Sequence, residues 1–234
     1  MSVVKQDALA ASAAAVSPEA AVPASAAAVS QTGGVPASER PEAAASPTVG
    51  GIVPHHLLAA NMIAGFFEAI SQNPPDTVVV IAPNHRRVGL KGIHTSTLGW
   101  CTPFGILEPD QTLSEMLVND IGASQNTLLM EEEHSISSLV PHIKYYLPNA
   151  KIVPVLLHGN YPLKEAQELG KILADEMCNE GSKIIAIASV DFSHYLDAQT
   201  ANKMDKDTLE AIKAFDIEAI SAMGNDNLDS PPSI

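Results

Sequence analysis

Short apolar runs alternate with longer segments of helical spacing along most of this chain. The run "TVVVIAP" at 77–83 is apolar after its first residue, which is typical of a strand buried on both faces. The segment 163–181 instead places apolar residues three and four positions apart, which indicates an amphipathic helix. By these criteria we predict strands at 48–54, 77–83, 150–159 and 182–189, and helices at 57–70, 111–122, 134–147, 163–181 and 200–223.

The alternation of strands and helices predicts the fold class. Continuous apolar strands joined by helices are typical of a mostly parallel sheet covered on both faces, which is a three-layer α/β/α architecture. A turn-rich stretch at 92–110 predicts a hairpin, and Pro141 is expected to interrupt the helix at 134–147. Ligands of such open sheets bind beyond the carboxyl ends of the strands, so polar residues that follow a strand deserve inspection.

Each predicted strand is followed by a histidine. The residues that follow the apolar runs of the four strands, the third of which is apolar through 157, are His55 and His56, Asn84 and His85, His158, and Asp191 with His194. Neutral imidazole is the commonest metal ligand in proteins, and imidazoles with one carboxylate suit zinc, iron or copper better than magnesium or calcium. The pattern therefore predicts a transition-metal site at the carboxyl edge of the sheet.

We expect His55 and His85 to share this site, and Asp191 to orient the imidazole of His194 or to hold a hydrogen bond behind it. Two alternatives remain open at this point: Asp191 only caps a turn, and His158 only ends a strand. We interpret the other histidines of the chain, apart from His134 at an apparent helix start, as structural or surface residues; they are His56, His94 and His142. The run of Glu131, Glu132 and Glu133 is interpreted as a solvated charged stretch, in which Glu133 adjoins His134.

Composition separates the N-terminal fifth of the chain from the rest. Residues 1–48 consist mostly of Ala, Ser, Pro and Val and contain no aromatic residue, so we predict a disordered tail or linker. We see no signal or transit peptide in this segment, although an anchor upstream of it would be invisible. The remaining residues, 49–234, are sufficient for one α/β domain.

The charge and the cysteines exclude several classes of function. The formal net charge of −14 argues against a nucleic-acid surface or an anionic membrane as partner, and no apolar run is long enough for a membrane helix. Cys101 and Cys178 are far apart and lack metal-ribbon spacing, so we expect a reducing cytoplasm. Cys101 is interpreted as a buried small apolar residue rather than a nucleophile.

Five segments together resemble the Memo family, whose prokaryotic members are called AmmeMemoRadiSam system protein B. In order along the chain they are "GIVPH" (51–55), "IAPNH" (81–85), "TPFG" (102–105), "EHSISSLVPHI" (133–143) and "SVDFSHY" (189–195). The resemblance implies a fold like that of the class III extradiol dioxygenases. It also implies that His55 and His85 approach a metal ion, and that His134, Asp191 and His194 line the same pocket.

The third metal ligand that the resemblance implies differs from the family pattern. Many Memo proteins have a Cys in a later "CG-x-x-PI" segment, and the comparable "DSPPSI" of this chain puts Asp229 at that position. Two histidines and a carboxylate are typical of non-haem iron(II) sites, whereas a Cys would favour copper. The alternative is that Asp229 caps a helix started by Pro231 and Pro232. Since family members continue further, we also expect a chain truncated at its C-terminus.

The sequence thus leaves three functions open around one mononuclear site. The first is a non-haem iron or copper enzyme of the dioxygenase type, with a divalent transition metal, Fe(II) favoured over copper or zinc, and with His194 moving a proton. The second is a metal-dependent hydrolase. The third is a protein that binds a metal or peptide without turnover. We expect a small-molecule or peptide ligand, whereas the oligomeric state is not indicated.

Overall fold

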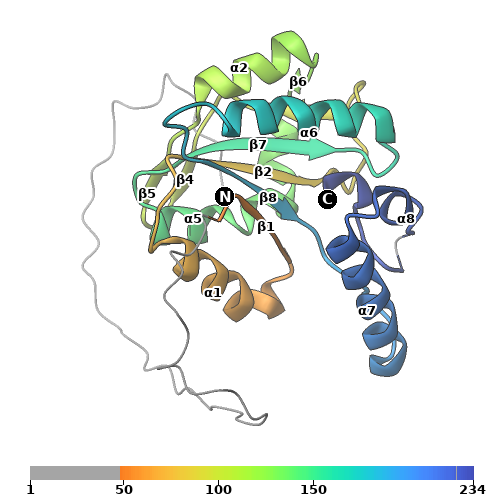
Figure 1. Ribbon diagram of the computed structural model, residues 1–234. Coiled ribbons are helices and arrows are strands. Elements are labelled where there is room, and N and C mark those ends of the chain that lie inside the picture. Colours follow the sequence, from red (N-terminus) through yellow and green to blue (C-terminus); the bar gives the residue numbers. More distant parts are fainter. Residues whose placement is uncertain (1–47, 225) are drawn as a thin grey trace, which may run out of the picture. The chain divides into compact units, whose positions relative to one another are not determined.

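The computed structural model describes residues 48–224 and 226–234. These residues form one six-stranded sheet with helices packed against it, and a separate two-stranded sheet (Figure 1). The tail predicted at 1–48 lies, apart from Thr48, outside the described residues. The strands of the sheet are β1 (Gly50–Val53), β2 (Thr77–Pro83), β3 (Ile93–Thr95), β6 (Ser124–Gln125), β7 (Lys151–Leu157) and β8 (Ile184–Ser189). Four of the six match the strands predicted from the apolar runs.

The strand order brings together segments that are far apart in the sequence. The order is β1-β8-β2-β7-β3-β6, in which β1, β8, β2 and β7 are parallel neighbours. Strand β3 runs antiparallel to β7, and β6 pairs parallel with β3. The predicted mostly parallel sheet is therefore confirmed. Because β8 lies between β1 and β2, the residues that follow these three strands emerge side by side at one edge.

Helices cover both faces of the sheet, as predicted. On one face α1 (Ala60–Ile70), α4 (His134–Ser137) and α5 (Val140–Tyr146) pack against Val78 and Val80 of β2. On the other, α2 (Gln111–Asp120) and α6 (Leu163–Met177) pack around Val79, because successive strand residues point to opposite faces. Figure 1 shows these two helical layers on either side of the strands. Within the described residues, no helix combines the length and the apolarity needed to cross a bilayer.

Two predicted helices are interrupted, each at an identifiable residue. The segment 134–147 divides into α4 and α5, with Pro141 in the first turn of α5, where a missing amide proton costs little. The segment 200–223 divides into α7 (Ala198–Ala214) and α8 (Ile217–Ser221) at Phe215, whose backbone is left-handed with φ of 52°. A short helix that the pattern did not predict, α3 (Thr127–Glu132), precedes α4.

The stretch at 92–110 forms the predicted hairpin only in part. Strands β4 (Trp100–Thr102) and β5 (Gly105–Leu107) pair antiparallel as a small separate sheet, whereas β3 joins the main sheet. Cys101 lies on β4 and is exposed, so its interpretation as a buried apolar residue was wrong. Cys178 is exposed as well, and both thiols are free.

The last described segment returns to the sheet beside β8. Leu228 is fully buried and packs with Val190, which anchors the residue that follows it. Asp229 then pairs with Asp191: its amide donates to the Asp191 carbonyl at 3.2 Å, and its Oδ1 accepts from the Asp191 amide at 3.2 Å. The single 3₁₀ turn after it, η4 (Pro231–Ser233), has Ser230 at its cap position, so Asp229 does not cap this turn.

Candidate metal centre

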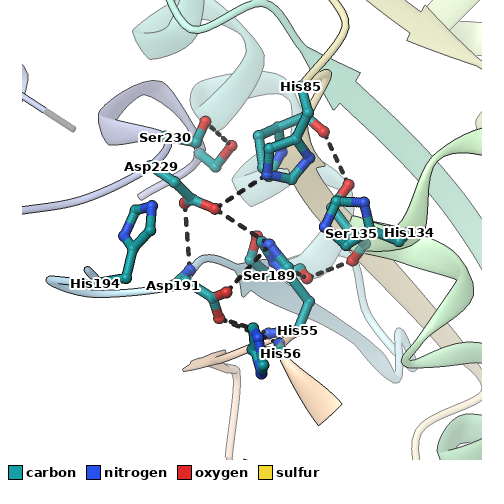
Figure 2. A network of polar contacts seen from close by, with 12 residues as sticks. His55, His56, His85, His134, Ser135, Ser189, Asp191, His194, Asp229 and Ser230 are labelled. Atoms are coloured by element: carbon teal, nitrogen blue, oxygen red, sulfur yellow. Dashed lines mark hydrogen bonds and ion pairs between the residues drawn. The ribbon is translucent and has the colours of Figure 1, made fainter. Parts of the chain in front are cut away.

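The carboxyl ends of β1, β2 and β8 gather imidazoles and carboxylates into one cluster (Figure 2). His55 follows β1, His85 follows β2 and Asp191 follows β8. The segment after Leu228 adds Asp229, and the start of α4 adds His134. The structure therefore brings together five of the six site residues predicted from the sequence.

His55 lies at the centre of the cluster with its ring fixed on one side. The residue is 2% exposed, and its Nδ1 is 3.3 Å from the Ser189 carbonyl oxygen. We assign a ring proton to Nδ1, because a carbonyl oxygen can only accept a hydrogen bond. Its Nε2 lies 3.1 Å from Asp229 Oδ2 and 3.5 Å from Asp191 Oδ2.

His85 is held twice by one buried carboxylate. Glu133 Oε2 accepts from the His85 amide at 2.9 Å, and Glu133 Oε1 is 2.8 Å from the ring Nδ1. A carboxylate on Nδ1 fixes the tautomer and orientation of an imidazole whose other nitrogen binds a metal. The His85 Nε2 faces Asp229 Oδ2 at 3.5 Å, so this nitrogen points into the cluster.

Asp229 joins the two histidines. A single oxygen, Oδ2, lies opposite the Nε2 atoms of both His55 and His85, while Oδ1 is held by the Asp191 amide. The side chain of Asp229 is 8% exposed, and a carboxylate this buried needs a positively charged or metal partner, which the protonated ring of His85 or a bound ion can supply. The carboxylate thus stands where an ion shared with the two imidazoles would need it.

Asp191 holds the backbone that follows β1 and does not contact His194 by a hydrogen bond within the described residues. Its Oδ1 accepts from the amides of His55 at 3.0 Å and His56 at 3.3 Å. The His194 Nδ1 instead lies 3.0 Å from the Phe192 carbonyl. No hydrogen bond joins Asp191 to His194 within the described residues, so the expected orientation of His194 by Asp191 is not what the structure has.

His134 and His194 lie at the exposed margin of the cluster. The His134 side chain is 65% exposed and stacks on the ring of His85, with centroids 4.4 Å apart and planes 20° apart. Its ring meets His55 edge to face at 5.3 Å. His194 is half-buried, and Figure 2 shows its ring on the Asp229 side of the cluster. Both imidazoles thus lie at the edge of the cluster, where they are partly accessible to solvent.

Two buried serines connect the start of α4 to β2 and β8 by hydrogen bonds beneath the cluster. The Ser135 hydroxyl donates to the carbonyl of Pro83, the last residue of β2, at 2.8 Å. The Ser189 hydroxyl donates to the Ser135 carbonyl, which ties β8 to the start of α4. Both serines are fully buried. These bonds join β2, β8 and the start of α4, the elements from which His85, Asp191 and His134 extend into the cluster.

The donor set fits a transition-metal ion. The ligand atoms of His55, His85 and His134 lie within 4.8 Å of one another, and so do those of His55, Asp191 and Asp229. In both central histidines Nδ1 faces a protein acceptor and Nε2 is directed at Asp229, so a metal ion could take the place of the proton between Nε2 and the carboxylate. Imidazole nitrogens with a carboxylate suit iron, zinc or copper and fit magnesium or calcium poorly.

A sequence comparison decides the family. The model of the Memo-like protein family matches residues 36–228, which is most of the chain. The chain belongs to the Memo-like family. MEMO1 family proteins of archaea are among its relatives: that of Methanothermobacter thermautotrophicus is 33% identical over 177 residues and that of Pyrobaculum aerophilum 29% over 172. These alignments cover 71% and 72% of this chain but 61% of each relative.

A third relative, the MEMO1 family protein of Methanopyrus kandleri, is 32% identical over 184 residues, with 75% of this chain and 64% of the relative covered. The chain thus spans less than two thirds of the length of these relatives. What the family comparison supports is a Memo-like protein with histidine and aspartate groups that could hold a metal ion.

The charges of this Memo-like centre act most strongly on His85. Hydrogen bonds to Asp229 and Glu133 raise the pKa of His85 to about 9 despite its partial burial. Burial alone would raise the pKa of Asp229, but the contacts with His55 and His85 lower it. Burial, followed by the charge of His85, lowers the pKa of His134. Of these two imidazoles, His134 gives up its proton more readily, whereas His85 holds its proton firmly until a metal displaces it.

Glu133 is the residue that the sequence pattern missed. It is 2% exposed and not part of a solvated run, although Glu132 beside it is exposed and pairs with Arg86. The signal that identifies Glu133 is the break between α3 and α4, where its side chain caps α4 by accepting from the Ser135 amide at 3.2 Å. Burial raises the pKa of Glu133, but hydrogen bonds from His85 and Ser135 more than offset this and lower it.

The remaining histidines lie outside the centre. His56 caps the 3₁₀ turn Leu57–Ala59, where its Nδ1 accepts from the Leu58 amide. His142 stacks near Phe67 on the helical face. His158, left open by the sequence, does not join the cluster and lies beside His94 instead.

Proposed function

We propose that this protein is a metal-dependent redox enzyme of the dioxygenase type, with a mononuclear site formed by His55, His85 and Asp229. The observation that carries the proposal is the convergence of two Nε2 atoms on one carboxylate oxygen, at 3.1 and 3.5 Å, while each Nδ1 faces a protein acceptor. Two histidines and one carboxylate are the ligand set of non-haem Fe(II) oxygenases. The resemblance to class III extradiol dioxygenases supports the same choice.

Fe(II) is the favoured ion, with copper and zinc as alternatives. When bound, Fe(II) supplies one-electron chemistry and open coordination positions for substrate or O₂. The carboxylate of Asp229 favours iron over copper, because oxygen ligands are harder than the thiolate that many Memo proteins carry at this position. The open side of the cluster, bordered by His134 and His194, is where a small molecule or a peptide side chain would approach.

Four residues around the metal ligands have orienting, proton-transfer or substrate-contacting roles in this proposal. Glu133 keeps His85 in the tautomer that offers Nε2, and Asp191 fixes the backbone of His55. His194 moves a proton to or from the substrate, because it is half-buried and its ring lies at the margin of the cluster without a carboxylate partner among the described residues. His134 contacts the substrate beside His85.

Anaerobic reconstitution tests the proposal. The chain, stripped of metal and supplied with Fe(II), should bind one equivalent at this centre and consume O₂ with a catechol-type substrate. The His55→Ala/His85→Ala variant should lose this ion and the O₂ consumption while keeping the circular dichroism of the parent, and His56→Ala is the matched control that keeps both. Iron bound equally well to the centre of the double variant would contradict the ligand assignment.

The same experiment separates the two other functions. Zinc bound at the centre together with ester or amide cleavage would indicate a hydrolase, in which the ion lowers the pKa of a bound water to about 7. A centre that binds a peptide but shows no turnover with iron, copper or zinc would indicate a binding protein. Either result would replace the redox proposal and leave the geometry of the site unchanged.

A further inference from the structure

A second pair of histidines lies apart from the metal centre. His94 is on β3 and His158 directly follows β7, and their ring centroids are 5.6 Å apart with planes inclined by 36°. His94 is 0% exposed, and in the part of the chain that the structure describes neither of its ring nitrogens forms a hydrogen bond of good geometry, although the Lys91 backbone is close enough to act on its pKa. His158 is half-buried, so the pair is accessible from one side.

Two unpaired nitrogens in a buried imidazole are costly. A neutral imidazole has one donor and one acceptor, and a buried polar atom left without a partner costs about 1–3 kcal/mol. Native proteins rarely tolerate such atoms, and each one calls for an explanation such as a bound ion or an ordered water. Burial, followed by the neighbouring His158, lowers the pKa of His94, so its ring keeps a free lone pair near neutral pH.

The spacing of the two rings matches that of imidazoles that share an ion. Metal–nitrogen bonds of 2.0–2.1 Å in a tetrahedral site place the centroids of two coordinating imidazoles about 5 Å apart. The rings of His55 and His85 in the first centre are 5.2 Å apart, close to the 5.6 Å of His94 and His158. A carbonyl lies in reach as a further oxygen ligand: His158 Nε2 is 3.4 Å from the Val88 oxygen.

We propose that His94 and His158 form a second transition-metal site, of the kind that takes zinc, with the Val88 carbonyl and solvent completing its ligands. The site is independent of the function proposed above. We assign it a structural role, because His94 is fully enclosed and the ion would join two strand ends to the loop that contains Val88.

The ion would fasten the loop that follows His85. The Asn84 amide donates to the Val88 carbonyl at 2.8 Å, and its oxygen accepts from the Val88 amide at 3.3 Å. Gly89, at φ of 108°, packs directly on the His94 ring: a Cβ there would lie 2.1 Å from the ring Cε1. An ion between His94 and His158 would therefore join the 84–92 loop to the ends of β3 and β7.

Zinc calorimetry on a variant without the first centre tests the proposal. The His55→Ala/His85→Ala chain should still bind one equivalent of Zn²⁺, and X-ray absorption at the zinc edge should report two imidazole ligands. Adding His158→Ala should weaken zinc binding by at least about 10- to 100-fold. That is the loss of affinity typical when only a residue hydrogen-bonded to a ligand is removed, and here a ligand itself is removed. Adding His142→Ala to the same background is the matched control and should leave it unchanged.

His158→Ala is chosen because this side chain is half-buried and its loss leaves no large cavity, whereas removal of the enclosed His94 could disturb folding. As a second readout, Zn²⁺ should protect the amides of residues 86–92 from hydrogen exchange in the His55→Ala/His85→Ala chain. A background that binds no Zn²⁺, or one that keeps full affinity after His158→Ala, would overturn the second site. Neither result would bear on the first centre.

Discussion

Glu133 shows how a single buried carboxylate sets the chemistry of its neighbour. It accepts from both the amide and the ring of His85, so the tautomer and the charge of that ring depend on it. The sequence indicated His55 and His85, because each follows an apolar strand. It did not indicate Glu133, because three consecutive glutamates look alike in sequence and only the break between α3 and α4 buries one of them.

Glu133→Gln should weaken metal binding by about 10- to 100-fold. The amide of the glutamine would donate to the His85 Nδ1, which moves the ring proton to Nε2 and blocks the nitrogen that the metal needs. The pKa of His85 should fall from about 9, because one of the two carboxylates that raise it is gone. Calorimetry with the metal and a histidine NMR titration measure the two effects. Glu132→Gln, on an exposed side chain, is the control and should change neither.

Metal affinity should rise with pH up to about 9. The ion competes with a proton for the Nε2 of His85, whose pKa is raised to about 9, so binding at pH 7 releases about one proton and the affinity gains about tenfold per pH unit. In the metal-free chain the same raised pKa stabilises the fold fully below about pH 6.5, and this contribution disappears as the pH rises through about 9. Calorimetry in buffers of different ionisation enthalpy measures the proton release. An affinity that stays flat from pH 7 to 9 would contradict the assignment.

At the scale of elements, long apolar or periodic segments could be predicted from the sequence, whereas the short elements could not. The strands at 77–83 and 182–189 could be predicted because they are long apolar runs buried on both faces. Strand β3 has three residues and pairs antiparallel with β7 through contacts that no local pattern encodes. For the same reason Asp229, which lies 38 positions after its partner Asp191, could be assigned to the site only through the family resemblance.

Asp110 connects α2 to the sheet, so its removal should destabilise both the helix and its contact with β2. Its Oδ1 caps α2 by accepting from the Leu113 amide at 3.1 Å, and its Oδ2 accepts from the hydroxyl of buried Thr77 at 2.7 Å. Asp110→Ala should lower the free energy of unfolding by about 2 kcal/mol, the sum of a lost cap and an unpaired hydroxyl. Urea unfolding measures this loss. Asp197→Ala, which removes only the exposed cap of α7, should cost less; an equal or larger loss there would contradict the account.

At the scale of the whole molecule, strand order creates the site. Strand β8 is the last of the sheet in sequence but lies between β1 and β2, so Asp191 reaches the cluster beside His55 and holds Asp229, which faces both His55 and His85. The apolar runs predicted a parallel sheet but gave no order for its strands, because order is set by packing between distant segments. The prediction that several strands end at one edge of the sheet was sufficient to place a group of histidines there. Which of these histidines lie in contact could be known only from the strand order.

A metal that binds the folded centre should stabilise the whole domain. Binding at a free concentration 100 times the dissociation constant adds about 2.7 kcal/mol to the free energy of unfolding. The midpoint of thermal unfolding should therefore rise on addition of Fe(II) under anaerobic conditions and fall back when a chelator removes it. The His55→Ala/His85→Ala variant should show at most the smaller shift due to other sites. An equal shift in the parent and this variant would place the stabilising ion elsewhere.

The position of a bound ion tests the central claim most directly. Anomalous diffraction from crystals of the Fe(II)-loaded chain locates the metal without reference to activity. We expect one ion within bonding distance, about 2.0–2.2 Å, of His55 Nε2, His85 Nε2 and an Asp229 carboxylate oxygen. An ion bound at full occupancy away from these three atoms, with none between them, would contradict the account.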